Sequence, residues 1–370
     1  MKRALILGTN AGQADIIEYL KQTGWEVHAC GNKKEGPGFE LAHRFHQVDT
    51  IDVEAVARLA DSVKADIVYS VSSDVNIRSA TKVSEALNLP VLLGSPIVDL
   101  FHFKDRLRGF LNQKNISPVG YRHVKNVSEA DDWDIFPCVV KPVDSQGQRG
   151  VELLHDKQGI QNAIQVAIEN SSTDTAILEE YLEGVEISTN MIVQNHKILV
   201  NEFTERLVHG NKFFGLPKGH SIPVRHVSEQ NIDEARLMVT ALVEELNIKD
   251  AVLYIQMIVN HQGPKIVEIA PRLDGCHIWR LLKYAKGYDL RKLAIDCLTG
   301  EKVVLPEDVD QKNEPYSLLF HQMPTHAVFD DSAFCPEGGL LFNEYRYKAG
   351  EVVQPINGSL EVVGYYIQKD

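Results

Sequence analysis

Short apolar runs alternate with helical patterns over the first 95 residues of the chain. Residues 4–7 and 66–71 are apolar runs of strand length, whereas the apolar positions of residues 53–63 recur at helical spacing. Strands that alternate with helices predict a parallel, doubly wound sheet. In full, we expect strands at 4–7, 25–29, 66–71 and 91–93 and helices at 16–23, 53–63 and 77–87.

Two polar turns follow strands of this predicted sheet. Residues 8–12 read Gly-Thr-Asn-Ala-Gly, and residues 70–74 read Ser-Val-Ser-Ser-Asp. Both turns are expected at the carboxyl ends of their strands, where the ligands of open α/β sheets lie. The first turn has the spacing G-x-x-x-G, so the G-x-G-x-x-G fingerprint of dinucleotide binding is absent. We interpret its glycines as parts of a tight strand-to-helix turn.

The pattern changes after a helical connector at residues 98–118. Residues 138–141 and 151–154 predict a hairpin whose loop, residues 145–150, contains two glycines. A helix and two further strands follow, which indicates antiparallel strands that carry helices, an α+β arrangement. We expect that helix at 159–169 and those strands at 176–178 and 187–193.

A second hairpin is predicted at residues 198–227, with a long excursion at 206–220 that is rich in basic, aromatic and glycine residues. Long loops inside compact domains are usually functional or disordered. The fold class is therefore α/β and α+β, and it ends in a β-rich segment with many Gly and Pro turns. Before that segment we expect a helix at 231–246 and strands at 252–259 and 265–269.

The bulk composition limits the classes of partner. At 370 residues the chain is long enough for two or three domains. Its net charge of −13 argues against a general binder of nucleic acid or of anionic membranes, but it permits a local basic pocket for phosphates. The five cysteines are scattered and form no CxxC pair, so neither a zinc site nor a disulfide framework is indicated.

The cysteine pattern and the apolar runs also predict the compartment. Isolated cysteines suit a reducing compartment, so we expect a cytoplasmic protein. The apolar run at residues 4–7 is too short for a signal peptide, and no apolar run approaches the length that spans a membrane. We therefore expect no membrane partner and no nucleic-acid partner.

The most informative stretch for chemistry is residues 266–280. Glu268 lies in a short apolar run, Pro271 breaks that run, and Arg272 follows directly. A carboxylate beside a cation at a strand end suits a Mg-nucleotide site, because the carboxylate can hold the metal and the cation can meet a phosphoryl or carboxylate oxygen. The alternative interpretation of this short motif is a strand followed by a polar turn.

Two lysines upstream favour the nucleotide site. Lys104 and Lys141 lie on separate predicted elements, so both can contact the phosphates of one triphosphate. Gly147 and Gly150 allow backbone N–H groups of the intervening loop to approach the same phosphates. For Lys104 the alternative is an ordinary solvated lysine on a helix.

A third group of residues offers contacts for a nucleoside. Residues 179–182, Glu-Glu-Tyr-Leu, offer backbone groups for an adenine edge, and Glu186 offers a carboxylate for ribose hydroxyls. Glu179 and Glu180 are also open to the alternative of ordinary surface carboxylates.

In their order and spacing these pieces resemble the ATP-grasp superfamily, whose ligases bind ATP between two α+β lobes. The resemblance covers about residues 1–300 and implies a Rossmann-like first domain, a small lobe at about 120–185 and a larger lobe at about 186–300. It implies ATP and Mg²⁺ as cofactors. It assigns Lys104 and Lys141 to the phosphates, Ser145, Gly147 and Gly150 to the lid, Glu179, Glu180, Tyr181 and Leu182 to the adenine hinge, Glu186 to the ribose, Glu268 to the metal, and Arg272 to the transferring phosphoryl group.

The chain departs from the pattern of the superfamily at two positions. Members usually carry an acidic metal ligand on the penultimate core strand, where this chain has Gln256, and many have Asn where this chain has Ala270. Gln256 is a neutral oxygen donor that binds Mg²⁺ more weakly than a carboxylate, and Asp274 could compensate. The string Glu-Ile-Ala-Pro-Arg is similar to one in the ATP-grasp carboxylase of purine synthesis, but here Leu-Asp-Gly-Cys-His follows it.

The resemblance implies phosphorylation of a carboxylate by ATP and attack of an amine on the acyl phosphate, with Lys141 and Arg272 as catalytic residues. An amide-forming ligase with small-molecule carboxylate and amine substrates is therefore the first interpretation. The alternatives are a bicarbonate-using carboxylase and a nucleotide-binding protein that has lost catalysis. Candidates for holding an anionic substrate are Arg206, His209, Lys212, His220 and His277. Asp274 is a further candidate for contact with the substrate, and we interpret Cys276 as a buried cysteine.

The expected domains follow from these assignments. A homodimer is expected at the level of the superfamily only. We predict a Rossmann-like domain at 1–97, a helical connector at 98–118, a small ATP-grasp lobe at 119–185, a large ATP-grasp lobe at 186–300 and a β-rich C-terminal domain at 301–370.

Overall fold

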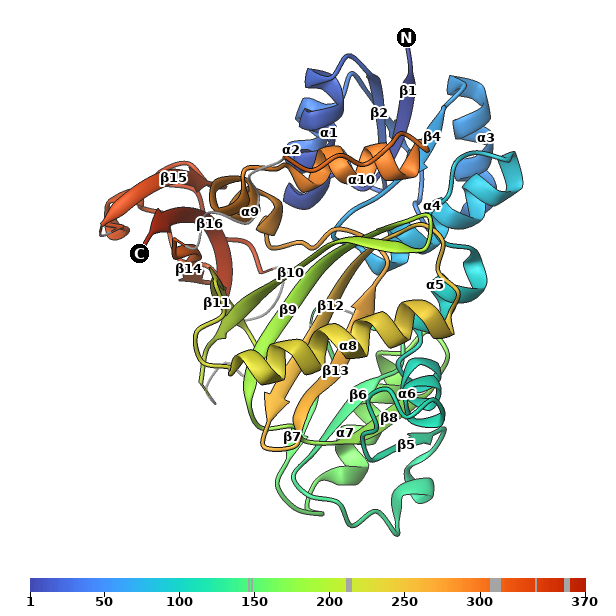
Figure 1. Cartoon of the computed structure of the whole chain (residues 1–370), viewed down its shortest axis with the longest axis vertical. Coiled ribbons are helices and arrows are strands. Elements are labelled where there is room, and N and C mark those ends of the chain that lie inside the picture. Colours follow the sequence, from blue (N-terminus) through green and yellow to red (C-terminus); the bar gives the residue numbers. More distant parts are fainter. Residues whose placement is uncertain (146, 148, 211–214, 307–313, 337, 356–359) are drawn as a thin grey trace.

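The computed structural model contains three sheets in its described residues, which are 1–145, 147, 149–210, 215–306, 314–336, 338–355 and 360–370. Figure 1 shows the first sheet and its helices at one end of the long axis and the lobe of residues 121–180 at the other end. The largest sheet lies between them. This arrangement confirms the predicted fold class, an α/β unit followed by α+β lobes.

The first sheet is parallel and has the strand order β3-β2-β1-β4. The apolar run at residues 4–7 is completely buried, as expected for a parallel strand that is covered on both faces. The predicted alternation of strands and helices is therefore confirmed. The elements are β1 (Arg3–Leu7), α1 (Ala11–Gln22), β2 (Glu26–Gly31), α2 (Pro37–Leu41), β3 (Arg44–Gln47), α3 (Val53–Val63), β4 (Ile67–Tyr69) and α4 (Asp74–Leu87).

The prediction of a strand at residues 91–93 is wrong, because these residues form an irregular, bent segment outside any strand. Pro90 precedes them and has no N–H to donate to a ladder, and Gly94 then begins the next helix as its N-cap. Leu93 is buried instead in a core shared by the connector helices and the large sheet. Those connector helices are α5 (Ser95–His102) and α6 (Lys104–Gln113).

The small lobe is an antiparallel sheet with the strand order β5-β8-β6-β7. Its helix α7 packs on the sheet through a core that contains Trp133, Ile164 and Leu178. The predicted hairpin is confirmed, since β6 and β7 pair and the loop of residues 145–150 joins them. The elements are β5 (Tyr121–Val124), β6 (Cys138–Pro142), β7 (Glu152–Leu154), α7 (Ile160–Glu169) and β8 (Ala176–Glu180).

The large sheet has the strand order β13-β12-β9-β10-β11-β14-β16-β15. Helix α8 crosses one face of it, and α9 and α10 lie toward the first sheet (Figure 1). The C-terminal segment is β-rich, as predicted, and its strands extend the large sheet through the pairing of β11 with β14. The elements are β9 (Val185–Gln194), β10 (Lys197–Val208), β11 (Pro217–Ile222), α8 (Glu229–Glu245), β12 (Ala251–Asn260), β13 (Gly263–Ala270), α9 (Ile278–Lys286), α10 (Leu290–Leu298), β14 (Tyr316–Pro324), β15 (Gly339–Tyr345) and β16 (Leu360–Lys369).

One hydrophobic core joins the first sheet to the large sheet. It contains Leu5 and Val68 of the first sheet, Val252 of β12, Leu282 of α9 and Tyr365 of β16. Apolar burial across these elements is the main stabilising term that fixes their relative position. The turns at the carboxyl edge of the first sheet are thereby held against the end of β13. The exact domain boundaries stay a prediction.

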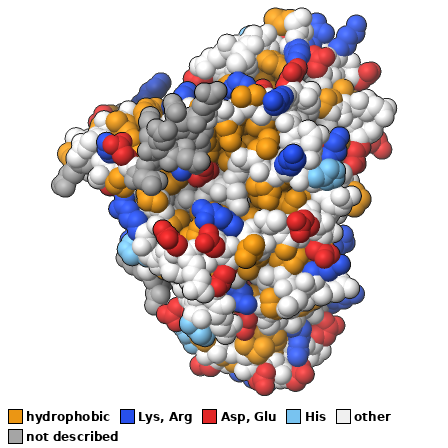
Figure 2. All heavy atoms as spheres, viewed as in Figure 1, with side chains coloured by type: hydrophobic (Ala, Val, Ile, Leu, Met, Phe, Trp, Pro, Cys, Tyr) orange, Lys and Arg blue, Asp and Glu red, His pale blue; other side chains and the backbone are white. Residues whose placement is uncertain are grey.

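The charged side chains are mixed on the face of the molecule that Figure 2 draws. Acidic and basic side chains are interspersed there. Among the described residues, no helix has both the length and the apolar character that crossing a membrane requires.

Candidate active site

Residues from four parts of the chain line one pocket beside the end of β13. Asp74 comes from the first domain, Lys104 from the connector, Asp144 and Ser145 from the small lobe, and Glu268 from β13. The pocket holds a cavity of about 10 Å³, which is room for one water molecule. Any ligand larger than a water molecule would therefore require the walls of this pocket to move apart.

Lys104 closes this pocket from the connector side. It is the first residue of α6, and its backbone N–H donates a 2.8 Å hydrogen bond to the carbonyl of Val143. Its Nζ donates a 2.7 Å hydrogen bond to the carbonyl of Ser145. The structure therefore brings Lys104 to the predicted lid loop. Gly147 and Gly150 of that loop have left-handed backbones, with φ of 69° each, while Gln146 and Gln148 lie outside the described residues.

Lys141 lies in a buried cluster of charges. Its Nζ is 2.5 Å from Oε2 of Glu179, and Nε of Arg108 is 2.9 Å from the other carboxylate oxygen. Burial raises the pKa of Glu179, but the two cations outweigh it and lower that pKa to about 2. Glu179 is therefore an anion that orients Lys141.

Glu180 and Tyr181 of the predicted adenine hinge form hydrogen bonds with the backbone of neighbouring segments. The backbone N–H of Glu180 donates to the carbonyl of Gly120, and that of Tyr181 donates to the carbonyl of Pro137, both at 2.9 Å. The side chain of Glu180 accepts a 3.1 Å hydrogen bond from the backbone of Gly120. Leu182 follows after the end of β8 and is half-buried.

Glu186 and Arg206 form an ion pair between neighbouring strands β9 and β10. Nη2 of Arg206 also donates a 3.0 Å hydrogen bond to the carbonyl of Gly215. The sequence suggested different ligands for these two residues, ribose for Glu186 and an anionic substrate for Arg206. In the structure the charges of Glu186 and Arg206 neutralise each other. A ligand that binds one of these side chains must therefore either bind beside the other side chain or break the ion pair.

Glu268 and Gln256 are direct partners in the antiparallel pairing of β12 with β13. Side chains opposite each other in such a pair lie on one face of the sheet, with Cβ atoms about 5 Å apart. No group of three or more His, Cys, Asp or Glu side chains suited to a metal occurs among the described residues. One carboxylate and one amide oxygen fit Mg²⁺, which commonly takes one or two protein ligands and completes its shell with phosphate and water.

Arg272 follows β13 and reaches across to the first domain. Its Nε donates a 2.8 Å hydrogen bond to Oδ1 of Asp74, the first residue of α4. Burial opposes the charge of Arg272, but Asp74 and Glu268 hold its pKa above the ordinary value. The guanidinium is thus a fixed cation next to the pocket that contains Glu268.

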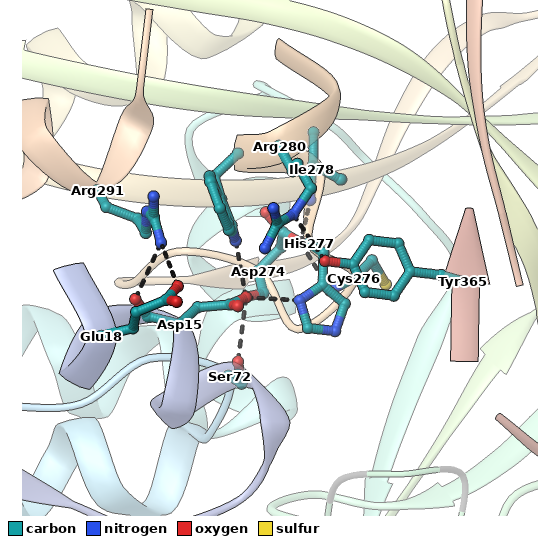
Figure 3. Close-up of polar contacts among 12 residues, drawn as sticks. Asp15, Glu18, Ser72, Asp274, Cys276, His277, Ile278, Arg280, Arg291 and Tyr365 are labelled. Carbon is teal, nitrogen blue, oxygen red and sulfur yellow. Dashed lines mark hydrogen bonds and ion pairs between the residues drawn. The ribbon is translucent and has the colours of Figure 1, made fainter. Parts of the chain in front are cut away.

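The loop of residues 273–277 is pinned to the first domain, as Figure 3 shows. The Ser72 hydroxyl donates a 3.1 Å hydrogen bond to the carbonyl of Asp274. The Asp274 carboxylate accepts hydrogen bonds from the backbone N–H groups of Cys276, at 2.7 Å, and Ile278, at 3.2 Å. Asp274 therefore shapes this loop through its side chain.

His277 connects three parts of the chain. Its Nδ1 is 2.5 Å from Oδ2 of Asp15 in α1, and its Nε2 is 2.8 Å from Nη2 of Arg346. Because a guanidinium only donates, Nε2 of His277 accepts that bond and Nδ1 carries the proton toward Asp15. The imidazole stacks on Tyr365 with ring centroids 4.3 Å apart, and only 1% of its side chain is exposed. This position gives the predicted substrate role of His277 no support.

The remaining substrate candidates lie in different surroundings. His220 is fully buried and contacts Thr204, and burial together with Arg206 lowers its pKa to about 3, so it is neutral at pH 7. His209 is 2.7 Å from the side chain of Gln322. Lys212 lies outside the described residues. Cys276 is half-buried, and burial raises the pKa of its thiol to about 12.

Sequence reasoning missed several residues of this site. Arg108 is four residues after Lys104 on α6, a spacing that puts both on one helix face and could have drawn attention to it. Asp74 belongs to the polar turn at 70–74 but was not singled out. His102 and Asp144, which also line the pocket, carry no pattern that distinguishes them from other polar residues.

Comparisons with known proteins find similarity in part of the sequence and in the fold. Residues 118–276 match a family model described as an ATP-grasp domain. The large chain of carbamoyl phosphate synthase from Clostridium acetobutylicum is 21% identical over 324 residues, which is 82% of this chain and 30% of that one. The formate-dependent phosphoribosylglycinamide formyltransferase of Prochlorococcus marinus subsp. pastoris is 24% identical over 73% of this chain and 70% of that protein.

A solved structure extends the likeness to the whole fold. The L-amino acid ligase from Bacillus licheniformis superposes with a TM-score of 0.81 over 100% of this chain and 93% of that one, at 16% identity. Identity at this level shows the fold alone. The chain spans about 30% of the length of the carbamoyl phosphate synthase large chains, so the activity of those whole proteins does not carry over directly. The match over residues 118–276 identifies an ATP-grasp domain in this part of the chain, and the chain as a whole shares the fold of the amino acid ligase.

Proposed function

We propose that this protein is an ATP-dependent ligase that activates a small-molecule carboxylate as an acyl phosphate and joins it to an amine. The observation that carries this proposal is the convergence of Lys104, Ser145 and Glu268 on one pocket, with Arg272 beside it. Two cations and a carboxylate at one point suit the transfer of a phosphoryl group, which needs alignment and neutralisation of charge more than covalent catalysis.

The binding of ATP would use the residues around this pocket. Lys104 and Lys141 would contact phosphate oxygens, and the backbone of Leu182 would meet the adenine edge. Glu268, with Gln256 opposite it, would hold Mg²⁺, which when bound neutralises charge on the phosphates. The hydrogen bond from Lys104 to Ser145 must break for the phosphates to enter, so the lid would open during binding.

The proposed reaction has two steps. A carboxylate oxygen of the substrate attacks the γ-phosphorus of ATP, so that a new P–O bond forms and the bond to the β-phosphate oxygen breaks, which releases ADP. The amine nitrogen then attacks the acyl carbon, the C–N bond forms, and phosphate leaves with the carboxylate oxygen while the amine loses a proton to solvent. Arg272, which Asp74 orients, would stabilise the negative charge that develops on the transferring group.

The test follows the carboxylate oxygen. Release of ADP is first measured with mixtures of amino acids, and separately with bicarbonate plus an aminoimidazole ribotide. The active carboxylate is then labelled with ¹⁸O. The proposal predicts ¹⁸O in the released phosphate and ADP as the nucleotide product. Release of AMP would contradict it, and turnover only in the mixture of bicarbonate and the ribotide would favour the carboxylase. Binding of ATP without turnover in any mixture would favour a protein that has lost catalysis.

Matched variants connect the activity to the pocket. Arg272→Lys keeps the positive charge but loses the two-point contact with Asp74, so we expect a large loss of turnover with little change in ATP affinity. Lys197→Met changes an exposed lysine of β10 and serves as the control, with unchanged turnover.

A further inference from the structure

The loop after β13, which carries Arg272, is tied to the first domain at both of its ends. At its start, Nε of Arg272 donates a hydrogen bond to Oδ1 of Asp74 in α4. At its end, Nδ1 of His277 lies 2.5 Å from Oδ2 of Asp15 in α1. The first contact touches the proposed phosphoryl-transfer pocket, whereas Asp15 and His277 do not line that pocket. The proposed reaction therefore gives the second contact no role.

Asp15 binds three side chains at the start of α9 and in α10, as Figure 3 shows for His277 and Arg291. Its Oδ2 accepts the hydrogen bond of His277 and another, of 2.7 Å, from Nε1 of Trp279. Its backbone carbonyl accepts a 3.1 Å hydrogen bond from Nη1 of Arg291. Burial raises the pKa of Asp15, but the contacts with His277 and Trp279 outweigh burial and lower that pKa. Asp15 is therefore an anion that holds the start of α9.

Aromatic and guanidinium contacts form a closed circuit around this carboxylate. Cζ of Arg291 lies 3.3 Å from the centre of the Trp279 ring, and Cζ of Arg280 lies 4.4 Å from it. Nε of Arg280 donates a 2.8 Å hydrogen bond to the hydroxyl of Tyr365. Since Tyr365 stacks on His277, the contacts return to the imidazole that the carboxylate binds. Buried polar networks whose members are satisfied rigidify their surroundings and define one arrangement.

The backbone at His277 depends on such support. His277 is the N-cap of α9 and has a left-handed backbone, with φ of 59°, which is uncommon for residues other than glycine. Its side chain makes no capping hydrogen bond to the helix. A strained conformation of this kind persists only where the surrounding contacts determine it. The hydrogen bond from His277 to Asp15 is such a contact.

The turn at His277 is coupled to Arg272 through a short stretch of chain. Only residues 273–276 separate them. Oδ1 of Asp274 also accepts a 3.2 Å hydrogen bond from the backbone N–H of Ile278, the first residue of α9. A shift of the helix start would therefore move the loop and the guanidinium of Arg272 with it. A misplacement of about 1 Å can lower the rate of a reaction by about 100-fold.

We propose that Asp15 is a positioning residue for phosphoryl transfer, which holds Arg272 in its working orientation through the turn at His277. The inference rests on the proposed ligase function for the transfer step. Lys104 and Lys141 lie on other elements, so replacement of Asp15 should lower kcat and leave the affinity for MgATP unchanged. A carboxylate that only anchored the first domain would change stability and leave kcat of the folded protein as it is.

Two replacements of Asp15 test this role. Asp15→Asn keeps one carbonyl oxygen, which can accept both hydrogen bonds that Oδ2 accepts, whereas Asp15→Leu accepts none. Release of ADP is measured per mole of protein that binds MgATP in a calorimetric titration, so that unfolded protein does not count. We expect kcat to fall about 100-fold in Asp15→Leu and less than about fivefold in Asp15→Asn, with the dissociation constant for MgATP within about twofold of the wild type in both. Glu54→Gln changes an exposed carboxylate of α3 and is the matched control, with unchanged kcat.

NMR of the arginine Nε–H groups in ¹⁵N-labelled full-length protein reads the orientation of Arg272 without turnover. The signal of Arg272 is the one that disappears in Arg272→Lys. Because this N–H is buried and bonded to Asp74, we expect it to exchange slowly with water in the wild type. We expect exchange about tenfold faster in Asp15→Leu, as the loop opens more easily, and exchange as in the wild type in Asp15→Asn.

Unchanged exchange of the Arg272 signal in Asp15→Leu would overturn the positioning role. A kcat of Asp15→Leu within about twofold of the wild type would overturn it as well, and Asp15 would then be an anchor of the first domain only. If the wild type releases no ADP with any substrate mixture, the proposed ligase function fails. The exchange of the Arg272 signal then decides by itself whether Asp15 positions this side chain.

Discussion

Nζ of Lys141 lies 2.5 Å from Oε2 of Glu179, and both side chains are about nine-tenths buried. Arg108 occupies the second oxygen of the same carboxylate, so one anion holds two cations. A phosphate-binding lysine held in this way loses little side-chain entropy when a nucleotide arrives, because it is already oriented. The same arrangement makes the lobe sensitive to the loss of the carboxylate.

We predict that Glu179→Gln destabilises the protein by about 3–5 kcal/mol at pH 7, because two buried cations lose their counter-charge. The pKa of Glu179 is about 2 in the folded protein and near its ordinary value of 4.5 when unfolded. Its contribution is therefore complete above pH 4.5 and is lost as the pH falls toward 2. Urea unfolding at pH 7 and at pH 3 measures both effects.

Glu183→Gln is the matched control, since Glu183 is exposed and its replacement should change the free energy of unfolding by less than about 0.5 kcal/mol. If Glu179→Gln also changed the free energy of unfolding by less than about 0.5 kcal/mol relative to the wild type, the charge cluster would not stabilise the lobe.

The pair of Gln256 and Glu268 predicts a graded response to Mg²⁺. Glu268→Gln removes the carboxylate and should raise the Mg²⁺ concentration needed for nucleotide binding, by about tenfold or more if one charged ligand is worth 1.5–3 kcal/mol. Gln256→Glu adds a second carboxylate opposite the first and should lower that concentration. Titration of Mg²⁺ at fixed ATP, with binding detected by fluorescence of a nucleotide analogue, measures both shifts.

Unchanged Mg²⁺ requirements in both variants would exclude this metal site. Equal Mg²⁺ requirements in the wild type, Glu268→Gln and Gln256→Glu would mean that neither oxygen approaches the metal. Glu229→Gln, at the exposed start of α8, controls for a general change of charge.

His220 predicts a dependence of stability on pH. Burial and the charge of Arg206 lower its pKa to about 3, whereas an unfolded histidine has a pKa near 6.5. The unfolded chain then binds a proton that the folded protein excludes, so stability rises with pH between 3 and 6.5. His220→Gln should flatten this rise relative to the wild type by up to about 5 kcal/mol.

Unfolding in urea at pH 7, 5.5 and 4.5 measures the difference between the two proteins. His261→Gln changes an exposed histidine in the turn between β12 and β13 and should leave the pH profile as it is. A His220→Gln profile parallel to that of the wild type would show that His220 takes up its proton at the same pH in the folded and unfolded states, against the lowered pKa.

The order of strands and helices, and the proximity of a few polar segments, follow from local sequence patterns. Hydrophobic periodicity predicts the strands and helices, and strand ends predict that the turns at 8–12 and 70–74 meet, as a cavity lined by both turns confirms. The hairpin of β12 and β13 predicts that Glu268 and Gln256 lie near each other, because their distance from the turn is fixed by the register.

The pairings that could not be predicted join residues far apart in the chain. Arg272 and Asp74 are 198 residues apart, and His277 and Asp15 are 262 apart. Their contacts depend on how the first sheet docks on the large one through a shared core, which no local pattern encodes. The ion pair of Glu186 and Arg206 is a different case, because these residues are only 20 apart and lie on the paired strands β9 and β10, a pairing that the sequence analysis did not predict.

We propose the pocket between Lys104, Ser145 and Glu268 as the phosphate site for MgATP. Calorimetric titration of a non-hydrolysable MgATP analogue into the wild type, Lys104→Met and the control Lys197→Met tests this directly. We predict that Lys104→Met binds the analogue about 10- to 100-fold more weakly, because one charge-assisted hydrogen bond is lost, and that Lys197→Met binds it as the wild type does. Equal affinity in all three proteins would contradict the assignment of this pocket to the phosphates.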